Sequence, residues 1–385
     1  MDAVYLPRYE MPGNLARHAP HEADGSGHLR CRRICSKPQE EQIEASEVFL
    51  QLLIVRKEVA CEWPGEVRDR TTAFLQKIED VVQKTERHEE TIDACRILGE
   101  LYKATKGVAY SEWLPGAATY MHNLAYRLQN SKLYNLAAKA EIEAVKFRRQ
   151  LFARNLDLYA SDLANSLHNL GFYLGNLGEY DKALIADQEA VKHRRKLAAY
   201  NPNLHSSDLA DSLHNLGRHL SDLGKYNEAL VADREAVNLR RRLAAQDPDR
   251  HNPDLAMSLH QLAYYLRNTN NYMEAISTAR ECVFLRRQMV AKDPDRYTSN
   301  LAISLHQYGS YLGSSGRFNE AVMAFKEAAR LHGELIVRDA LFHKAEKVKA
   351  LRFMAIYLRN QGKVVDAQRA EREVEMLVRS RTTNW

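Results

Sequence analysis

A ten-residue pattern returns at a fixed interval through the middle of the chain. It begins with Asp or Asn, continues as Leu-Ala-x-Ser-Leu-His followed by Asn or Gln, and ends in a small residue. The same interval reaches His122 upstream and Tyr357 downstream, so about six units are expected. So regular a repeat indicates a stack of small units rather than the two or three domains that a length of 385 residues would suggest. The four clear copies stand 46 residues apart and start at Asp162, Asp208, Asp254 and Asn300.

Each unit contains two helix-forming runs. Four leucines recur at spacings of four, three and four, which places them on one stripe of a helix: Leu163, Leu167, Leu170 and Leu174. The segment around Gly178 breaks this pattern, and a second run follows it and ends near Pro202. One position of the second run is alanine in every unit, as close approach of paired helices requires. These alanines are Ala137, Ala183, Ala229, Ala275, Ala321 and Ala367.

The unit resembles the tetratricopeptide repeat, whose pattern is W-x2-L-G-x2-Y in the first helix and A-x3-F in the second. The first helix here has aliphatic residues in place of the aromatic ones. In the second helix, Asp187 and Asp233 stand where an aromatic residue is usual, and Phe325 restores it. The matching positions are Leu167-x2-Leu170-Gly171-x2-Leu174, the turn Gly178-Glu179-Tyr180, and then Ala183 and Ala190.

This resemblance implies an all-α fold, a right-handed superhelical solenoid of antiparallel helix pairs with a 46-residue period. The period exceeds the common tetratricopeptide length by about twelve residues. We place this extra length in the second helix and in the loop after it. The long form is similar to the repeats of kinesin light chains and to the repeat arms of fungal and bacterial signalling proteins. The resemblance covers roughly residues 116–379.

The repeats fade at both ends, which divides the chain into five expected segments. Residues 1–40 have scattered Pro, Gly and His without a sustained apolar period, and we expect a disordered tail there. Degenerate helical repeats forming an N-terminal cap are expected over 41–115, and five tetratricopeptide-like repeats over 116–340. A capping repeat over 341–379, with Arg352 in place of the recurrent histidine, and a short tail over 380–385 complete the chain.

Composition narrows the class of protein further. Only 10 Pro and 17 Gly occur, and 45% of the residues are hydrophobic, which favours a helical protein with a sizeable core. Five scattered cysteines fit a reducing, cytoplasmic location better than a disulfide framework. We expect neither a membrane span nor a secretion signal, because no apolar stretch is long enough. The net charge of +5 neither demands a nucleic-acid partner nor excludes an acidic one.

One side of each first helix is expected to line a concave groove. Residues such as Asn165 and His168 lie opposite the leucine stripe, and the first helices of a stacked solenoid form its inner wall. Each unit then contributes one row to a peptide-binding groove. The candidate ligand-binding residues are His122, Asn123, Tyr126, Asn165, His168, Asn169, Phe172, His214, Asn215, Arg218, His260, Gln261, Tyr264, His306 and Gln307.

Two rows of this side have distinct expected roles. The Asn and Gln side chains offer donors and acceptors that can pair with the backbone of an extended peptide. The resemblance implies the same role, since peptide-binding members of the family commonly contact the ligand through the residues matching Asn123, Asn169 and Asn215. The next row varies from Tyr126 to Arg218, which suits the selection of ligand side chains. The alternative is an amide and imidazole ladder that bonds only neighbouring helices.

The recurrent histidines allow two further interpretations. Packed helices lie about 8–10 Å apart, so one histidine per unit forms a stripe rather than a tetrahedral site. We therefore expect no metal and no cofactor. A milder hypothesis is that protonation of several stacked imidazoles near pH 6 weakens peptide binding through like-charge repulsion.

Pairs of arginines recur late in the second helix of each unit. We expect them to be structural, because cations favour a helix C-terminus and can pair with aspartates such as Asp208 and Asp254 in the loops beyond. The alternative is a basic strip for nucleic acid or phosphorylated partners. No aromatic residues are interleaved with it for stacking, and we expect no nucleic-acid partner. The pairs are Arg148-Arg149, Arg194-Arg195, Arg240-Arg241 and Arg286-Arg287.

No catalytic motif stands out, whether a phosphate loop, a His-Glu-x-x-His motif or a serine elbow. Cys31 and Cys35, with His28 nearby, lack a second ligand pair for a metal. The sequence therefore predicts a non-enzymatic adaptor or scaffold that binds a peptide or protein partner. The alternative is a sensor or oligomerisation arm of an NLR-like (STAND-type) signalling system without its catalytic domain, in which the array self-associates. An enzyme within residues 1–115 is a third class without a supporting motif.

Overall fold

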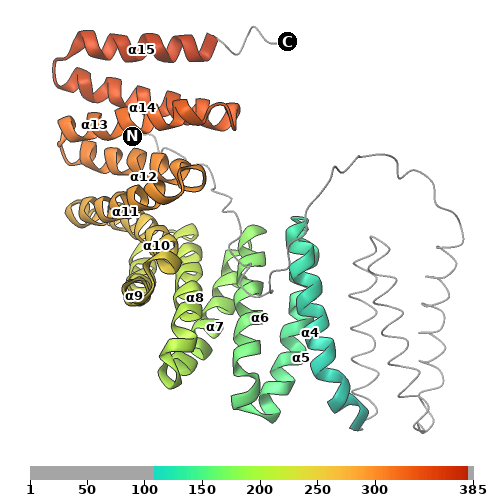
Figure 1. The fold of residues 1–385 in the computed structure, drawn as a ribbon. Helices are drawn as coiled ribbons and strands as arrows, with labels where there is room; N and C mark the ends of the chain where they lie inside the picture. The colour runs from blue at the N-terminus through green and yellow to red at the C-terminus, as the bar shows by residue number, and fades with distance from the viewer. Residues whose placement is uncertain (1–107, 380–385) are drawn as a thin grey trace, which may run out of the picture. The chain divides into compact units, whose positions relative to one another are not determined.

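The computed structural model describes residues 108–379, and every regular element in this range is an α-helix. Twelve helices follow one another as six antiparallel pairs, each made of a helix A and a helix B (Figure 1). The all-α class and the antiparallel pairs are confirmed. Residues 1–107 and 380–385 lie outside the described residues, so the expected tails and the division into segments stay predictions. The pairs are α4(Val108–Asn130) with α5(Tyr134–Arg154), α6(Leu156–Asn176) with α7(Tyr180–Tyr200), α8(Pro202–Asp222) with α9(Tyr226–Gln246), α10(Pro248–Asn268) with α11(Tyr272–Lys292), α12(Pro294–Ser314) with α13(Phe318–Leu335), and α14(Ala340–Asn360) with α15(Val364–Arg379).

The extra length of the repeat is distributed differently from our prediction. Helices A and B of the second to fourth units have 21 residues each, so both are long. A single residue connects each of these units to the next, and the long loop that we expected is absent from this part of the structure. The connection is short because its one residue is also the N-cap of the next helix A.

These N-caps use the side chains that favour helix starts. The Oδ1 atom of Asn201 accepts a hydrogen bond from the Leu204 backbone N–H at 3.3 Å, and Oδ1 of Asp247 accepts one from Arg250 at 3.1 Å. Proline follows both caps as the first helical residue, where its missing N–H removes no intrahelical bond. Helix B therefore stops and helix A starts within one residue.

The turn from helix A to helix B requires a left-handed backbone conformation at one residue. Gly178 has φ 78° there, and Gly224 has φ 74°. Glycine adopts this region without the steric cost of a Cβ atom. The first and fourth units use Lys132 at φ 59° and Asn270 at φ 62° instead. The turn that we predicted around Gly178 is thus the point where α6 ends and α7 begins.

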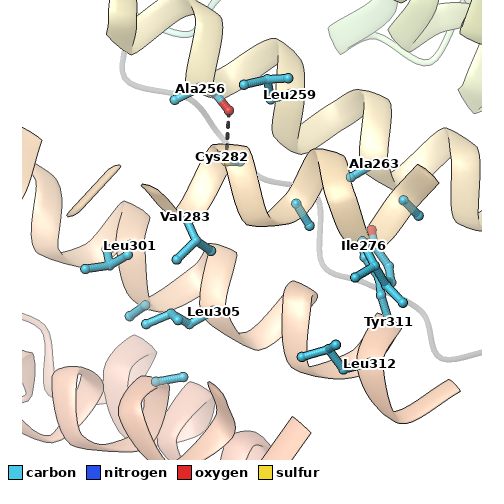
Figure 2. Close-up of a cluster of buried hydrophobic side chains, with 14 of the residues drawn as sticks. Ala256, Leu259, Ala263, Ile276, Cys282, Val283, Leu301, Leu305, Tyr311 and Leu312 are labelled. Atoms are coloured by element: carbon cyan, nitrogen blue, oxygen red, sulfur yellow. Dashed lines mark hydrogen bonds between the residues drawn. The ribbon is translucent and has the colours of Figure 1, made fainter. Parts of the chain in front are cut away.

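The core lies between the two helices of each unit and between successive units (Figure 2). Leu163 and Leu167 are each 1% exposed, and all six alanines of the recurrent row are fully buried. Figure 2 shows the same arrangement farther along, where Leu259 and Ala263 of α10, Ile276 of α11 and Leu305 of α12 contribute to one cluster. Burying this apolar surface is the main stabilising contribution to a stack of this kind.

The connection between the fifth and sixth units differs from the others. Helix α13 has 18 residues and ends at Leu335, and four residues, 336–339, precede α14. The register is unchanged, since α14 still begins 46 residues after α12. We call the contact between helix B of one unit and helix A of the next a joint. Within the described array, the last turn of helix B is unwound at this one joint. No helix within 108–379 has the length and hydropathy to cross a membrane.

Candidate peptide-binding face

Successive A helices lie close enough to share one face. Helix α6 contacts α8, α8 contacts α10, and α12 contacts α14, in addition to the contacts of each A helix with its two neighbouring B helices. We call the side of α4, α6, α8, α10 and α12 that lies opposite the leucine stripe, and that carries the fifteen candidate residues, the A-helix face. All fifteen candidate residues come from these five helices. Whether they contact a ligand is a prediction that the structure does not test, but their surroundings differ from row to row.

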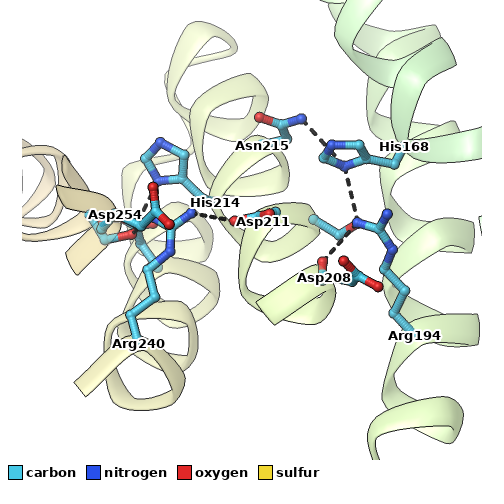
Figure 3. A network of polar contacts seen from close by, with 11 residues as sticks. His168, Arg194, Asp208, Asp211, His214, Asn215, Arg240 and Asp254 are labelled. Carbon is cyan, nitrogen blue, oxygen red and sulfur yellow. Dashed lines mark hydrogen bonds and ion pairs between the residues drawn. The ribbon is translucent and has the colours of Figure 1, made fainter. Parts of the chain in front are cut away.

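The histidines of the second and third units are engaged by neighbouring helices. The His168 Nδ1 atom of α6 lies 3.2 Å from the Ser212 hydroxyl of α8, and the Asn215 carboxamide of α8 lies 3.5 Å from the same nitrogen (Figure 3). The Nδ1 atom of His214 lies 3.0 Å from Oδ1 of Asp233, a fully buried carboxylate of α9. We expected these rings to face open space, and their polar atoms instead bond within the array.

The remaining histidines are also used in packing. Nδ1 of His122 lies 2.9 Å from Oε1 of Glu141, and Nδ1 of His260 lies 3.4 Å from the Ser304 hydroxyl. The ring of His306 packs edge-on against Phe325 and Phe353, with centroids 5.1 and 5.5 Å away. Four of the five imidazoles therefore make polar contacts with neighbouring helices, whereas Nδ1 of His306 is buried and has no hydrogen-bond partner among the described residues.

Burial also removes the expected titration of these rings near pH 6. It lowers the pKa of His168 and His260 to about 3 and that of His306 to about 4, because a charged imidazole loses its hydration there. Three of the five stacked imidazoles thus stay neutral at pH 6. The hypothesis of like-charge repulsion along the row near pH 6 is wrong for these three.

The carboxamide row is divided between packing and solvent. Asn123 is exposed and Asn169 is half-buried, and within residues 108–379 neither side chain has a hydrogen-bond partner. By contrast, the Asn165 Oδ1 atom accepts a hydrogen bond from Arg194 at 2.9 Å. One turn after Gln261 and Gln307, the phenol oxygens of Tyr265 and Tyr311 are buried and form no hydrogen bond with the described residues.

The variable row presents aromatic rings and one cation. Tyr126 is 37% exposed, and the half-buried Phe172 makes an edge contact with Tyr134 at 6.2 Å between centroids. The Arg218 guanidinium lies 5.5 Å from the centroid of Phe172, within the range of a cation–π interaction. In the fourth unit, Tyr264 makes an edge contact with Tyr226, again at 6.2 Å. These side chains are partly covered by one another and partly open.

Behind the A-helix face lies a row of buried arginines from the B helices. In the second unit, Nη1 of Arg194 donates to the Asp208 carbonyl at 2.7 Å and to the Ser212 hydroxyl at 2.6 Å (Figure 3). Arg148 makes the equivalent bonds to the Asp162 carbonyl and the Ser166 hydroxyl, at 2.7 and 2.6 Å. Each bond pair links the B helix of one unit to the A helix of the next. The buried arginine row is Arg148, Arg194, Arg240 and Arg286.

The structural role that we expected for these arginines is supported, and Arg194 and Arg240 do bond to Asp208 and Asp254, but through the backbone carbonyls rather than the carboxylates. Asp208 and Asp254 lie within α8 and α10 rather than in loops. A carboxylate partner occurs instead at Asp211, whose Oδ1 lies 2.7 Å from Nη2 of Arg240. Although burial opposes it, the Arg240 charge lowers the pKa of Asp211. Burial lowers the pKa of Arg194.

The second arginine of each pair lies on the outside and has a different partner. Arg149 Nη2 donates to Glu189 at 2.5 Å, and Arg195 Nη2 donates to Glu235 at the same distance. Each bond joins successive B helices, and both side chains are partly exposed to solvent. Both arginines of a pair are therefore held by contacts within the array. The surface arginine row is Arg149, Arg195, Arg241 and Arg287.

Sequence reasoning missed a set of buried acids in the B helices. Asp187, noted only as a departure from the tetratricopeptide pattern, is fully buried, and Nδ1 of His219 in the next unit lies 2.5 Å from its Oδ2. Burial raises the pKa of Asp187 despite this contact. Its carboxylate occupies the space beside Gly171, where a Cβ atom would lie 2.2 Å from Oδ1. The available signal was an acid within an apolar stripe, 32 residues before a histidine.

Comparison with known proteins agrees with this geometry. Residues 162–242 match the tetratricopeptide repeat family, so this part of the chain consists of repeats of that kind. Domains of this class generally bind proteins, and the family comparison finds no catalytic domain. A comparison with curated proteins gives no match.

Two solved structures illustrate the variety of array that this chain is similar to. The protein BtubC (BKLC) of P. vanneervenii is 13% identical, with a TM-score of 0.50 over 64% of this chain and 92% of that one. A putative kinesin light chain with nearly identical repeats from Podosopora anserina is 19% identical, with a TM-score of 0.45 over 58% of this chain and 98% of that one. The likeness concerns the fold alone.

Proposed function

We propose that this array is an adaptor or scaffold that binds a peptide or protein segment along its A-helix face. The observation that carries the proposal is the pair of carboxamides at Asn123 and Asn169, which have no hydrogen-bond partner among the described residues. They stand one turn before Tyr126 and Phe172, which are partly exposed. A polar donor and acceptor next to an open aromatic ring is a common arrangement in peptide recognition.

The carboxamide row and the variable row would contact different parts of the ligand. The carboxamides of Asn123 and Asn169 would pair with peptide N–H and C=O groups regardless of sequence. Tyr126, Phe172, Arg218 and Tyr264 would select ligand side chains, because each unit offers a different surface at this position. The buried arginine row and the histidines would act only by holding the A helices in place. Binding of this kind needs no cofactor and no chemical step.

A peptide-display selection tests the proposal even though the natural partner is unidentified. Peptides selected on the full chain would be titrated against Asn123→Ala/Asn169→Ala and against a control variant, Gln188→Ala/Asn238→Ala, whose residues are exposed on B helices. Loss of two hydrogen-bonded amides should weaken binding by about tenfold or more, at about 1 kcal/mol each. The control should bind like the wild type. Equal affinities for all three proteins would reject the A-helix face as the binding surface.

The oligomerisation arm remains the second candidate, and one observation favours it. The last helix pair leaves large apolar side chains open to solvent, with Val365 74% exposed and Met376 65% exposed. Light scattering after size exclusion would detect self-association, and Val365→Glu/Met376→Glu should abolish it if the end of the array is the contact. A chain that stays monomeric at high concentration would exclude this function.

A further inference from the structure

The buried arginine row is interrupted at the joint between the fifth and sixth units. The position 46 residues after Arg286 is His332, and the position 46 residues after Ser304 is Ala350, so both partners of the usual bond are replaced. In their place, Nδ1 of His332 in α13 lies 3.1 Å from Nδ1 of His343 in α14. His332 is fully buried and His343 is 6% exposed. A histidine pair therefore takes the place of a guanidinium at this joint.

We propose that the joint between the fifth and sixth units is a proton-sensitive hinge, which closes while the His332–His343 pair shares one proton between its facing nitrogens and opens when both nitrogens are protonated. In the neutral pair, one Nδ1–H donates and the other Nδ1 accepts. A second proton there places two donors face to face at 3.1 Å and adds a charge without hydration.

The joints that use the buried arginine row lack this response. A guanidinium stays protonated through the whole physiological range, so Arg194 keeps donating to Ser212 and to the Asp208 carbonyl as the pH falls. The equivalent arginines of the other three joints make the same two kinds of bond. The response to protons is therefore expected at one end of the array rather than along its length.

Charged groups face the pair from several helices. His306 of α12 and Lys349 of α14 oppose protonation of His332, while Glu346 of α14 favours it. Around His343, Asp339 and Glu346 favour protonation and Arg338 opposes it. Glu346 is held by Lys349 at 2.6 Å, and Lys347, which approaches α13 at Gly333, is held by Glu373 of α15. These neighbouring charges are engaged in ion pairs, and burial is the largest influence on the pKa of both histidines. It lowers the pKa of His332 to about 4 and also lowers that of His343.

The direction of the pH effect follows from these shifts. In the open joint the imidazoles regain an ordinary pKa of about 6.5, so opening takes up protons between about pH 6.5 and 4. The joint is fully stabilised above about pH 6.5. Protonation of His332 alone should increase the equilibrium constant for opening by up to about tenfold for each pH unit below that value.

The connection at this joint is suited to movement. Four residues, 336–339, join α13 to α14, whereas one residue joins the earlier units. The N-cap of α14 does not depend on α13, since Asp339 Oδ1 accepts the hydrogen bond from the Phe342 backbone N–H at 3.0 Å. The pair α14 and α15 can therefore separate from α13 without unwinding the start of α14.

Hydrogen exchange of the full chain between pH 7 and 5, corrected for intrinsic rates, tests the hinge. We expect amides of α14 and α15 to lose protection by at least about tenfold more than amides of α8 and α9. The double variant His332→Arg/Ala350→Ser restores the arginine–serine bond. In this variant, the ratio of the α15 exchange rate at pH 5.5 to that at pH 6.5 should be about tenfold smaller than in the wild type. The same pH dependence in both proteins would overturn the proposal.

Two further measurements keep the test decisive. Arg286→His/Tyr297→His/Ser304→Ala transfers the histidine pair to the preceding joint, since Tyr297 stands 46 residues before His343, and should create new pH-dependent opening there. If the restoring variant does not fold, proton NMR titration of wild-type His332 and His343 gives the answer directly. Titration below about pH 5 in the folded protein supports the hinge. Titration of both rings near pH 6.5 would contradict it, because the closed joint would then not exclude protons.

Discussion

Arg240 and Arg241 are adjacent in α9, yet they belong to different environments. The side chain of Arg240 is 3% exposed and donates to Asp211, Ser258 and the Asp254 carbonyl, all in A helices. The side chain of Arg241 is 46% exposed and pairs with Glu281 on the next B helix. The first arginine fixes how a unit sits on its successor through groups that solvent cannot replace. The second adds a contact that water and salt can replace.

The comparison shows how one repeat uses the same residue type in two ways. A rotation of about 100° around the helix separates adjacent residues, which is enough to move a side chain from a buried joint to the surface. The buried position requires an exact set of acceptors, and the same Ser and backbone carbonyl recur at each of its four sites. The surface position requires only an opposite charge within reach.

Removing a buried arginine should have the largest effect. Arg240→Ala leaves Asp211, Ser258 and a backbone carbonyl without their donor, and we expect the free energy of unfolding to fall by about 3 kcal/mol. Urea denaturation followed by circular dichroism measures the change. Arg241→Ala is the matched control and should cost less than about 1 kcal/mol. Similar losses in the two variants would remove the distinction between the rows.

Removing one acceptor of a buried arginine should have an intermediate effect. Ser212→Ala takes away the hydroxyl that accepts from Arg194 at 2.6 Å and lies 3.2 Å from Nδ1 of His168, while the carbonyl and Asn165 contacts of Arg194 remain. Hydrogen bonds to charged groups contribute about 1.5–3 kcal/mol, and we expect a loss near the lower end of that range. Ser207→Ala in the same helix serves as the control in the same denaturation experiment. No difference between the two serines would mean that Arg194 finds another acceptor.

Removing a surface arginine should have the smallest effect, and one that depends on salt. Arg195→Ala breaks the pair with Glu235 and should lower the free energy of unfolding by about 0.2–1 kcal/mol at low ionic strength. The difference from the wild type should vanish near 1 M NaCl, where the Debye length is about 3 Å. A loss that persists in high salt would show that Arg195 acts through packing instead.

The helical units could be predicted from the sequence because their signals are periodic. The leucine stripe that includes Leu163, the alanine row that includes Ala183 and the turn at Gly178 each repeat in register and depend only on helix geometry. The connecting segments were less predictable. A one-residue link that also caps a helix, as at Asn201, leaves no composition signal of a loop.

The polar interior was harder to predict, because it depends on contacts between units. Ser212 resembles an ordinary helix-surface residue in the sequence, and Asp187 stands out only as an acid within an apolar stripe. Their partners Arg194 and His219 lie 18 and 32 residues away. The histidine row was misplaced for the same reason, since a helical wheel does not include the neighbouring A helix. Asn123 and Asn169 were placed on the A-helix face by the same argument, and their ligand contact stays a prediction.

The residues that bond across each joint are also close in the sequence. Arg194 reaches its acceptors 14 and 18 residues later, and even the contact between Asn215 and His168 spans only 47 residues. A nascent chain leaving the ribosome can therefore complete each joint as soon as one more unit has emerged, without waiting for a distant segment. The units can therefore fold and stack one after another, from the N-terminal side onward, while the chain is being synthesised.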